Sequence, residues 1–374
     1  MKMAIVSYYY RPYKGVGAFR AIYWSENITK IDSNITCDVI TAMENVPENF
    51  LGKDAKVISV PDNHSSIIFS FLRLDSGITW RRSLEKYFKE KNDKYDILIF
   101  TGGPFLHFFV AKQLKKKMNC NIIFDFRDPF ANNPYYKNNP LKSLIKKYLE
   151  RKMLRISDLN ITVNSYCKDL MEKNDNTIVE IIENGYDDKV IKNISNKMNN
   201  KKHKFGYAGK FYSGVFPDNF LKVISESPYL NRCEFDYMGE SCSYIESFNK
   251  GNVMATQTVP YKEAIERVAQ FDTALLFTGG QPFQSTTKVF DYIGLEKNIL
   301  IITNGEPRTG NLYEITKDYP NVFWAHNSEN DIRNVLEKAM EHKPKPYPEK
   351  EKFSRDAGLR KLVNIINSLY VGKK

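Results

Sequence analysis

One segment in the second half of the chain combines hydroxyl, ammonium and carboxylate groups in a pattern that suits bound phosphates. Its members are Gly279, Gly280, Ser285, Thr286, Thr287, Lys288 and Asp291. The glycines end a predicted strand, the hydroxyls and Lys288 open a predicted helix, and Asp291 follows one turn later on the same face. Free amides and an ammonium at a helix start favour a diphosphate, and the carboxylate suits ribose hydroxyls. The alternative is an ordinary Ser or Thr N-cap.

Two other predicted strands end in charged residues. GYAGKFYSG (206–214) ends a strand with Gly209 and Lys210, whose ammonium can neutralise a phosphate; the alternative is a solvated loop lysine. IIFDFRDPF (122–130) places Asp125, Arg127 and Asp128 at the end of an apolar strand, where charge needs partners or solvent. These three residues either form structural salt bridges, or a carboxylate among them contacts a substrate hydroxyl or a developing positive charge on a sugar ring.

Glycine loops follow two strands of the first half. They contain Gly15, Val16, Gly17 and Arg20 in one loop, and Gly102 and Gly103 in the other. Glycines there let backbone amides approach a ligand, although a plain tight turn explains them too. The first loop matches a dinucleotide fingerprint poorly, because Arg20 occupies the third glycine position and the second strand does not end in an acidic residue. We therefore expect a ligand-facing loop that binds neither NAD nor FAD.

Short apolar runs alternate with amphipathic helical patterns along both halves of the chain. The runs are 4–7, 96–100, 121–126, 158–163, 204–209, 234–239, 253–259, 273–278 and 298–303. Continuous apolar strands that alternate with helices indicate parallel sheets covered on both faces. The sequence therefore predicts an α/β protein with two Rossmann-like, doubly wound domains.

The predicted domains are 1–191, then a linker at 192–203 that is rich in Asn and Lys, then 204–352. A proline-rich break at 342–352 precedes a final amphipathic helix within 353–374.

Composition and charge narrow the class of protein. Five cysteines without a CxxC pair indicate buried thiols in a reducing compartment. Because neither a signal peptide nor an 18-residue apolar stretch occurs, we expect a cytoplasmic protein. The net charge of +11 suggests an anionic partner. Residues 111–155 carry 12 basic and 3 acidic side chains and hold most of that excess.

At these residues the sequence resembles family 4 glycosyltransferases, which have the two-domain GT-B fold. The similar features appear in family order: GVG (15–17), DFRDPF (125–130), ENGYD (183–187), YAGKF (207–211) and STTKVFDYIGLEKNILI (285–301). The resemblance implies two domains facing across a cleft, with a nucleotide-sugar donor on the second domain and the acceptor on the first. The final helix would then cross back to the first domain.

The resemblance also implies roles for single residues. Lys210 and Lys288 would face the donor diphosphate and Asp291 the ribose. Asp128, with Arg127 and Asp125 beside it, would lie near the transferring sugar. A third group would lie at the interdomain cleft, where the donor binds: Glu183, Asn184, Gly185 and Tyr186. The family typically retains anomeric configuration without a metal. The absence of any Asp-x-Asp pair fits this, so we expect neither a metal nor a cofactor.

The chain departs from the family at three points. The family often carries two glutamates separated by seven residues; here Asp291 takes the second position and Phe283 the first, which puts a contact to the sugar in doubt. Lys210 replaces an arginine, and the lysine expected a few residues later is absent, since Ser213 and Gly214 stand there. A three-glycine first loop is reduced to 15–17.

Basic residues alternate with apolar ones in LKSLIKKYLERKMLR (141–155), which is typical of a helix that lies on an anionic membrane. We expect peripheral association with the inner face of the plasma membrane, and a saccharide or polyprenyl-linked saccharide acceptor from capsule or O-antigen (lipopolysaccharide) synthesis. A solvated basic face is the alternative.

Three other functions compete with transfer. A nucleic-acid-binding protein lacks support, because no binding motif appears. A catalytically silent relative that only binds a nucleotide-sugar, and a GT-B UDP-sugar epimerase, stay open. The histidine-rich site of the epimerase has little counterpart among five scattered histidines.

Overall fold

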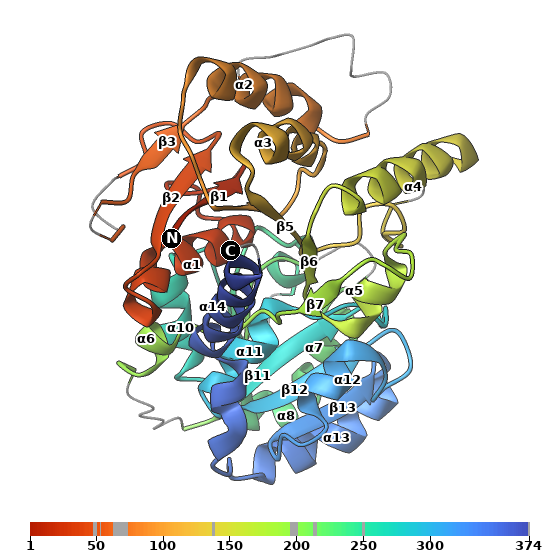
Figure 1. Cartoon of the computed structure of the whole chain (residues 1–374). Coiled ribbons are helices and arrows are strands. Elements are labelled where there is room, and N and C mark those ends of the chain that lie inside the picture. Colours follow the sequence, from red (N-terminus) through yellow and green to blue (C-terminus); the bar gives the residue numbers. More distant parts are fainter. Residues whose placement is uncertain are drawn as a thin grey trace. The chain divides into compact units, whose positions relative to one another are not determined.

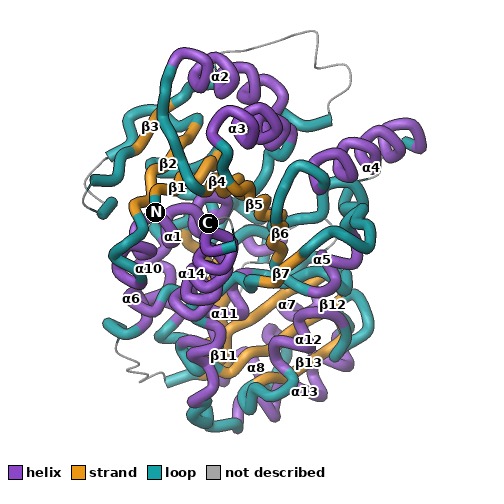
Figure 2. Tube along the Cα trace, in the orientation of Figure 1, coloured by secondary structure: helices purple, strands orange, loops and turns teal. Residues whose placement is uncertain are grey.

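The computed structural model describes residues 1–47, 51–52, 54–62, 74–136, 139–194, 201–211, 215–248 and 251–372 (Figure 1). The chain forms two compact units. The first comprises Met1–Glu183 together with Gly358–Lys374, and the second comprises Asn184–Ala357. In each unit helices flank one sheet of parallel strands (Figure 2).

The first unit contains a seven-stranded sheet with the order β3-β2-β1-β4-β5-β6-β7. Its strands are β1 (Lys2–Ser7), β2 (Thr36–Thr41), β3 (Val57–Ser59), β4 (Ile97–Thr101), β5 (Asn121–Phe126), β6 (Leu159–Thr162) and β7 (Val179–Ile181). Its helices are η1 (Val16–Ala18), α1 (Phe19–Ile31), α2 (Gly77–Glu90), η3 (Leu106–Val110), α3 (Ala111–Met118), α4 (Pro140–Leu154), α5 (Ser165–Leu170) and, from Gly358 onward, α14 (Arg355–Val371).

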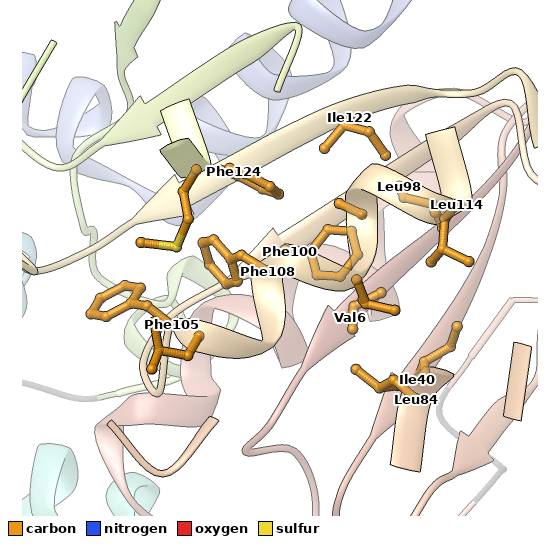
Figure 3. Close-up of a cluster of buried hydrophobic side chains, with 14 of the residues drawn as sticks. Val6, Ile40, Leu84, Leu98, Phe100, Phe105, Phe108, Leu114, Ile122 and Phe124 are labelled. Atoms are coloured by element: carbon orange, nitrogen blue, oxygen red, sulfur yellow. The ribbon is translucent and has the colours of Figure 1, made fainter. Parts of the chain in front are cut away.

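Hydrophobic residues cover both faces of this sheet, as near-continuous apolar strands require. Phe100 and Phe124 pack against Phe108 and against α2 and α3 on one face (Figure 3). On the other face α1 and α14 pack on the alternate strand residues, and Leu359 and Leu362 are fully buried there. The end of the chain is thus part of the first unit's core.

The second unit contains a six-stranded sheet with the order β10-β9-β8-β11-β12-β13. Its strands are β8 (His203–Ala208), β9 (Cys233–Met238), β10 (Val253–Thr256), β11 (Thr273–Thr278), β12 (Asn298–Thr303) and β13 (Val322–His326). Its helices are α6 (Asp188–Ile191), α7 (Asp218–Ser225), α8 (Tyr229–Arg232), α9 (Ser243–Glu246), α10 (Tyr261–Val268), α11 (Thr287–Gly294), α12 (Gly310–Thr316), α13 (Glu329–Glu341) and η4 (Pro348–Phe353).

Both sheets reverse their strand order once. The reversal lies between β1 and β4 in the first unit and between β8 and β11 in the second. In open α/β sheets ligands bind beyond the carboxyl ends of the strands at such a point. The predicted fold class, with two doubly wound parallel sheets, is confirmed.

The boundary between the units falls at Glu183, whereas the sequence placed the end of the first domain at 191. Residues 184–191 belong to the second unit because Tyr186 is buried in its core and hydrogen-bonds through its backbone to Phe353 and Arg355. The second unit also extends to Ala357 rather than 352. Of the predicted linker, 195–200 lies outside the described residues.

Candidate functional site

Two glycines at the strand reversal of the second unit, Gly209 and Gly280, allow neighbouring segments of the chain to approach closely. Gly209 follows β8 with φ 128°, and Gly280 follows β11 with φ 79°, conformations that L side chains rarely adopt. A Cβ on Gly209 would lie 2.6 Å from Cε of Lys288, and a Cβ on Gly280 would collide with Gly305. These positions require glycine, and they place the start of α11 beside the end of β8.

Lys288 presents an ammonium to this strand reversal. The side chain is part-buried, and its Nζ lies 5.0 Å from the ring centroid of Tyr207. Burial lowers the pKa of Lys288 to about 8, although nearby Asp291 opposes the shift. Within the described ranges no ion pair involves Lys288. A desolvated cation with open hydrogen-bonding capacity is a binding group for an anion.

The hydroxyl residues at the start of α11 fit both interpretations of this segment, a helix N-cap and a phosphate-binding site. Thr286 is the N-cap, since its side chain accepts a hydrogen bond from the amide of Lys288 at 3.4 Å. The hydroxyls of Ser285 and Thr287 make no hydrogen bond within the described part of the chain. Gly279 is part-buried beside Val215. One hydroxyl therefore caps the helix, and two remain available to a ligand.

Asp291 is buried in a network that the sequence did not predict. Its Oδ1 accepts a hydrogen bond of 2.6 Å from the hydroxyl of Tyr261, and Arg355 reaches that hydroxyl at 3.5 Å. Arg355 also pairs with Asp187 at 3.3 Å. Burial raises the pKa of Asp291 to about 6. No motif in the sequence points to Tyr261, which lies 30 residues away in α10.

Of the predicted donor segment, residues 184–186 belong to the second unit, whereas Glu183 is the last residue of the first unit before the boundary. A Cβ on Gly185 would lie 2.6 Å from the carbonyl oxygen of Phe353, and the carbonyl of Gly185 accepts from Arg355 at 2.8 Å. Tyr186 is a core residue. Arg355 thus links this segment to the Tyr261–Asp291 network.

Lys210 is exposed and forms a 2.7 Å ion pair with Glu240. Glu240 lines a cavity of about 510 Å³ at the carboxyl ends of β9 and β10, together with Gly239, Thr256 and Gln257. Gly239 contacts the backbone of Gly209, so the cavity adjoins the strand reversal. The expected lysine position, now Ser213 and Gly214, lies outside the described residues.

In the first unit Asp125 and Arg20 form a buried pair. Asp125 accepts a 2.5 Å hydrogen bond from Thr101, and Arg20 lies 3.6 Å from its other oxygen. Arg20 also donates to the carbonyl of Ile182, and burial lowers its pKa. Because Asp125 has no exposed surface, this geometry matches the salt-bridge interpretation.

Arg127 and Asp128 lie at the surface of the same strand end. Asp128 is exposed, and Arg127 is part-buried with an Nε that has no partner among the described residues. The Arg127 guanidinium packs against Gly102 (φ 72°), where any Cβ would collide with it, and lies within 3.9 Å of a Cβ built on Gly17. The two glycine loops and Arg127 therefore converge.

Tyrosines that the sequence analysis did not single out complete this surface. The rings of Tyr9 and Tyr13 stack with centroids 4.5 Å apart, and Tyr13 packs against Gly15. Tyr13 and Val16 are exposed, whereas Gly103 contacts Phe105. The tyrosine-rich run SYYYRPY was the available signal.

Comparison with solved structures places the fold. The chain is similar to Anabaena Alr3699/HepE in complex with UDP and glucose (TM-score 0.66, 10% identity, 98% of this chain and 100% of that one). It is also similar to a glycosyltransferase from Rickettsia africae (TM-score 0.64, 12% identity, 100% and 98%). A third is a protein from Listeria monocytogenes described as a UDP-N-acetylglucosamine 2-epimerase (TM-score 0.62, 10% identity, 99% and 97%). No curated protein matches the chain in sequence.

The two sheets and these neighbours define the fold as GT-B. Residues 33–190 match the family model described as Glycosyltransferase Family 4. The predicted resemblance to family 4 glycosyltransferases is therefore confirmed over these residues, and the solved structures agree with it in fold.

Proposed function

We propose that the chain transfers a sugar from a nucleotide-sugar whose diphosphate binds the second unit at the strand reversal. The observation that carries this proposal is Lys288: a part-buried ammonium without an ion-pair partner in the described residues, at the start of α11 beside Gly209. Helix-end amides and an ammonium stabilise the negative charge that grows on a leaving diphosphate. The complexes of the Anabaena protein with UDP-glucose and with UDP and glucose support this donor class.

The nucleoside would occupy the cavity next to this site. The cavity of about 510 Å³ falls in the size range of ligand pockets. Thr256 and Gln257 supply polar groups in this cavity. Asp291 of α11, which accepts a hydrogen bond from Tyr261, would contact the ribose hydroxyls. In this arrangement Lys210 exchanges its ion pair with Glu240 for a phosphate.

The first unit would hold the acceptor. Asp128 is exposed and can contact an acceptor hydroxyl, Arg127 can neutralise a phosphate, and the stacked Tyr9 and Tyr13 give an apolar surface for a sugar ring. We propose an envelope saccharide or polyprenyl-linked saccharide as acceptor, with retention of configuration. No metal takes part in this mechanism, because Lys288 and the α11 amides supply the positive charge.

Peripheral membrane contact fits this acceptor. Leu141, Leu144 and Tyr148 of α4 are exposed by 67%, 65% and 55% on a helix rich in lysine. A basic helix with exposed apolar residues can lie at an anionic membrane surface. Among the described residues no helix is long and apolar enough to cross a membrane.

Thermal-shift assays with UDP, GDP, dTDP, ADP and CMP test the donor site, since a ligand that binds the native state raises the melting temperature. We expect one nucleotide to stabilise the wild type and a Lys262→Ala control, whose lysine is exposed, but not Lys288→Ala. Equal stabilisation of Lys288→Ala would contradict the assignment.

A silent nucleotide-sugar-binding relative is the second candidate, favoured by Phe283, which is buried where the family often has a glutamate. It predicts nucleotide binding without product. An epimerase finds less support in the described histidines. His107 is fully buried between aromatic rings, and His203 starts β8 at the end opposite to Gly209.

A further inference from the structure

The first unit contains an apolar groove that the transfer reaction does not use. It has a volume of about 710 Å³, which falls in the range of ligand pockets. Leu106 and Phe109 of η3 and Ile145 and Leu149 of α4 line its floor. Residues of α2, η3 and α4 pack in the same hydrophobic cluster of the first unit. A groove of this size and polarity suits a hydrocarbon chain.

Six basic side chains also line the groove, and we call them its cationic rim. They are Arg81, Lys112, Lys115, Lys116, Lys152 and Arg155. None of the described lining residues is acidic. Arg81 pairs with Glu85 and Lys115 with Asp158, each at 2.7 Å. The other four form no ion pair within the described ranges, so the rim keeps an uncompensated positive charge.

Helix α4 carries apolar residues on two adjacent faces. Ile145 and Leu149 line the groove, while Leu141, Leu144 and Tyr148 are exposed. The first pair is spaced i, i+4 and the second group i, i+3, i+7, so each group forms a stripe along the helix. Soluble proteins rarely expose two adjacent apolar stripes on one helix, whereas lipid can cover both stripes of a helix at a membrane surface.

We propose that this groove binds one anionic membrane lipid, with its hydrocarbon chain on the apolar floor and its phosphate on the cationic rim. Charge complementarity selects a phosphate, and the floor selects a long chain. The proposal rests on the proposed function in one respect: a lipid-linked acceptor requires the enzyme to work at a membrane. It differs from diffuse attraction to a charged surface, because the groove itself must be intact.

Vesicle co-sedimentation with phosphatidylcholine, with and without phosphatidylglycerol, tests this site. One variant removes rim charge (Lys112→Gln, Lys116→Gln, Arg155→Gln). A second keeps the charge and makes the floor polar (Ile145→Gln, Leu149→Gln). The matched control removes three charges from exposed lysines outside the groove (Lys86→Gln, Lys89→Gln, Lys94→Gln).

We expect wild type and control to pellet with phosphatidylglycerol vesicles, and both groove variants to bind at least about tenfold more weakly. Absence of wild-type binding would overturn the proposal. So would wild-type affinity in the polar-floor variant, or equal weakening in rim and control variants, either of which indicates a diffuse surface effect. Melting curves establish that each variant is folded. Nucleotide binding, measured on the same samples, reports on the second unit, so a failure of the donor site is recognised separately.

Discussion

Lys288 packs directly against Gly209: a side-chain carbon on that glycine would lie 2.6 Å from Lys288 Cε and 2.9 Å from Nζ. The contact joins the end of β8 to the start of α11, two segments almost 80 residues apart in sequence. Glycine at this position is what leaves room for the ammonium at the strand reversal.

Gly209→Ala should therefore impair the donor site. The new methyl group displaces Lys288, and φ 128° is strained for any residue with a Cβ. We expect nucleotide affinity to fall at least about tenfold and stability to fall by about 1–3 kcal/mol. Calorimetry and urea unfolding measure these effects. Gly251→Ala is the matched control, because no atom lies within 4 Å of its added Cβ. Unchanged affinity in Gly209→Ala would refute the contact's role.

Nucleotide binding should weaken as Lys288 loses its proton. The pKa of Lys288 is about 8, and a bound diphosphate favours the protonated form, so the bound state has the higher pKa. Protonated Lys288 falls about tenfold between pH 7 and pH 9, and the dissociation constant should rise by up to about the same factor. Calorimetry over this range, where a terminal phosphate is already ionised, gives the profile. Lys288→Gln should bind weakly with a flat profile; an equal slope in that variant would assign the titration to another group.

The buried carboxylate of Asp291 should lower the free energy of unfolding at neutral pH, where it is ionised. Its folded pKa of about 6 exceeds the ordinary 3.8, so the wild type loses stability as pH rises from about 4 to 6. The cost reaches about 3 kcal/mol at pH 7.5 and about 1 kcal/mol at pH 4.5. Asp291→Asn keeps an acceptor for Tyr261, so it should be more stable than wild type by up to these amounts.

Urea unfolding at both pH values measures this difference, with exposed Asp318→Asn as control. A lower stability of Asp291→Asn at pH 7.5 would show that the ionised carboxylate is a net stabiliser.

Replacing Asp125 should affect mainly stability, whereas replacing Asp128 should affect mainly sugar transfer. Asp125→Asn leaves the buried Arg20 without its counter-charge and should reduce the free energy of unfolding by about 3 kcal/mol. Asp128→Asn removes an exposed group and should change stability by less than about 0.5 kcal/mol while reducing sugar transfer at least about 100-fold. Urea unfolding and product assays measure both. Full transfer activity in Asp128→Asn would remove it from the site.

The fold was predictable because apolar strand runs and amphipathic helices repeat along both halves, and a buried parallel sheet requires that pattern. Gly280 and Lys288 were predictable as neighbours of one strand end. Tyr261 was not, since its contact with Asp291 joins helices 30 residues apart and depends on packing. The buried ion pair between Asp125 and Arg20 was not predictable either, because in the sequence both residues resemble other charged residues near glycine loops. The predicted end of the first unit, at residue 191, lies eight residues too late, because Tyr186 packs in the hydrophobic core of the second unit.

The central claim is that an ammonium and helix-end amides of the second unit bind a nucleoside diphosphate without a divalent ion. The direct measurement is calorimetric titration, in the presence of EDTA, of the nucleoside diphosphate selected by thermal shift. We expect saturable one-site binding to wild type and to Lys262→Ala, and a loss of at least about tenfold in Lys288→Ala. Folded wild-type protein that takes up no nucleoside diphosphate, or binds one only when a divalent ion is supplied, would contradict it.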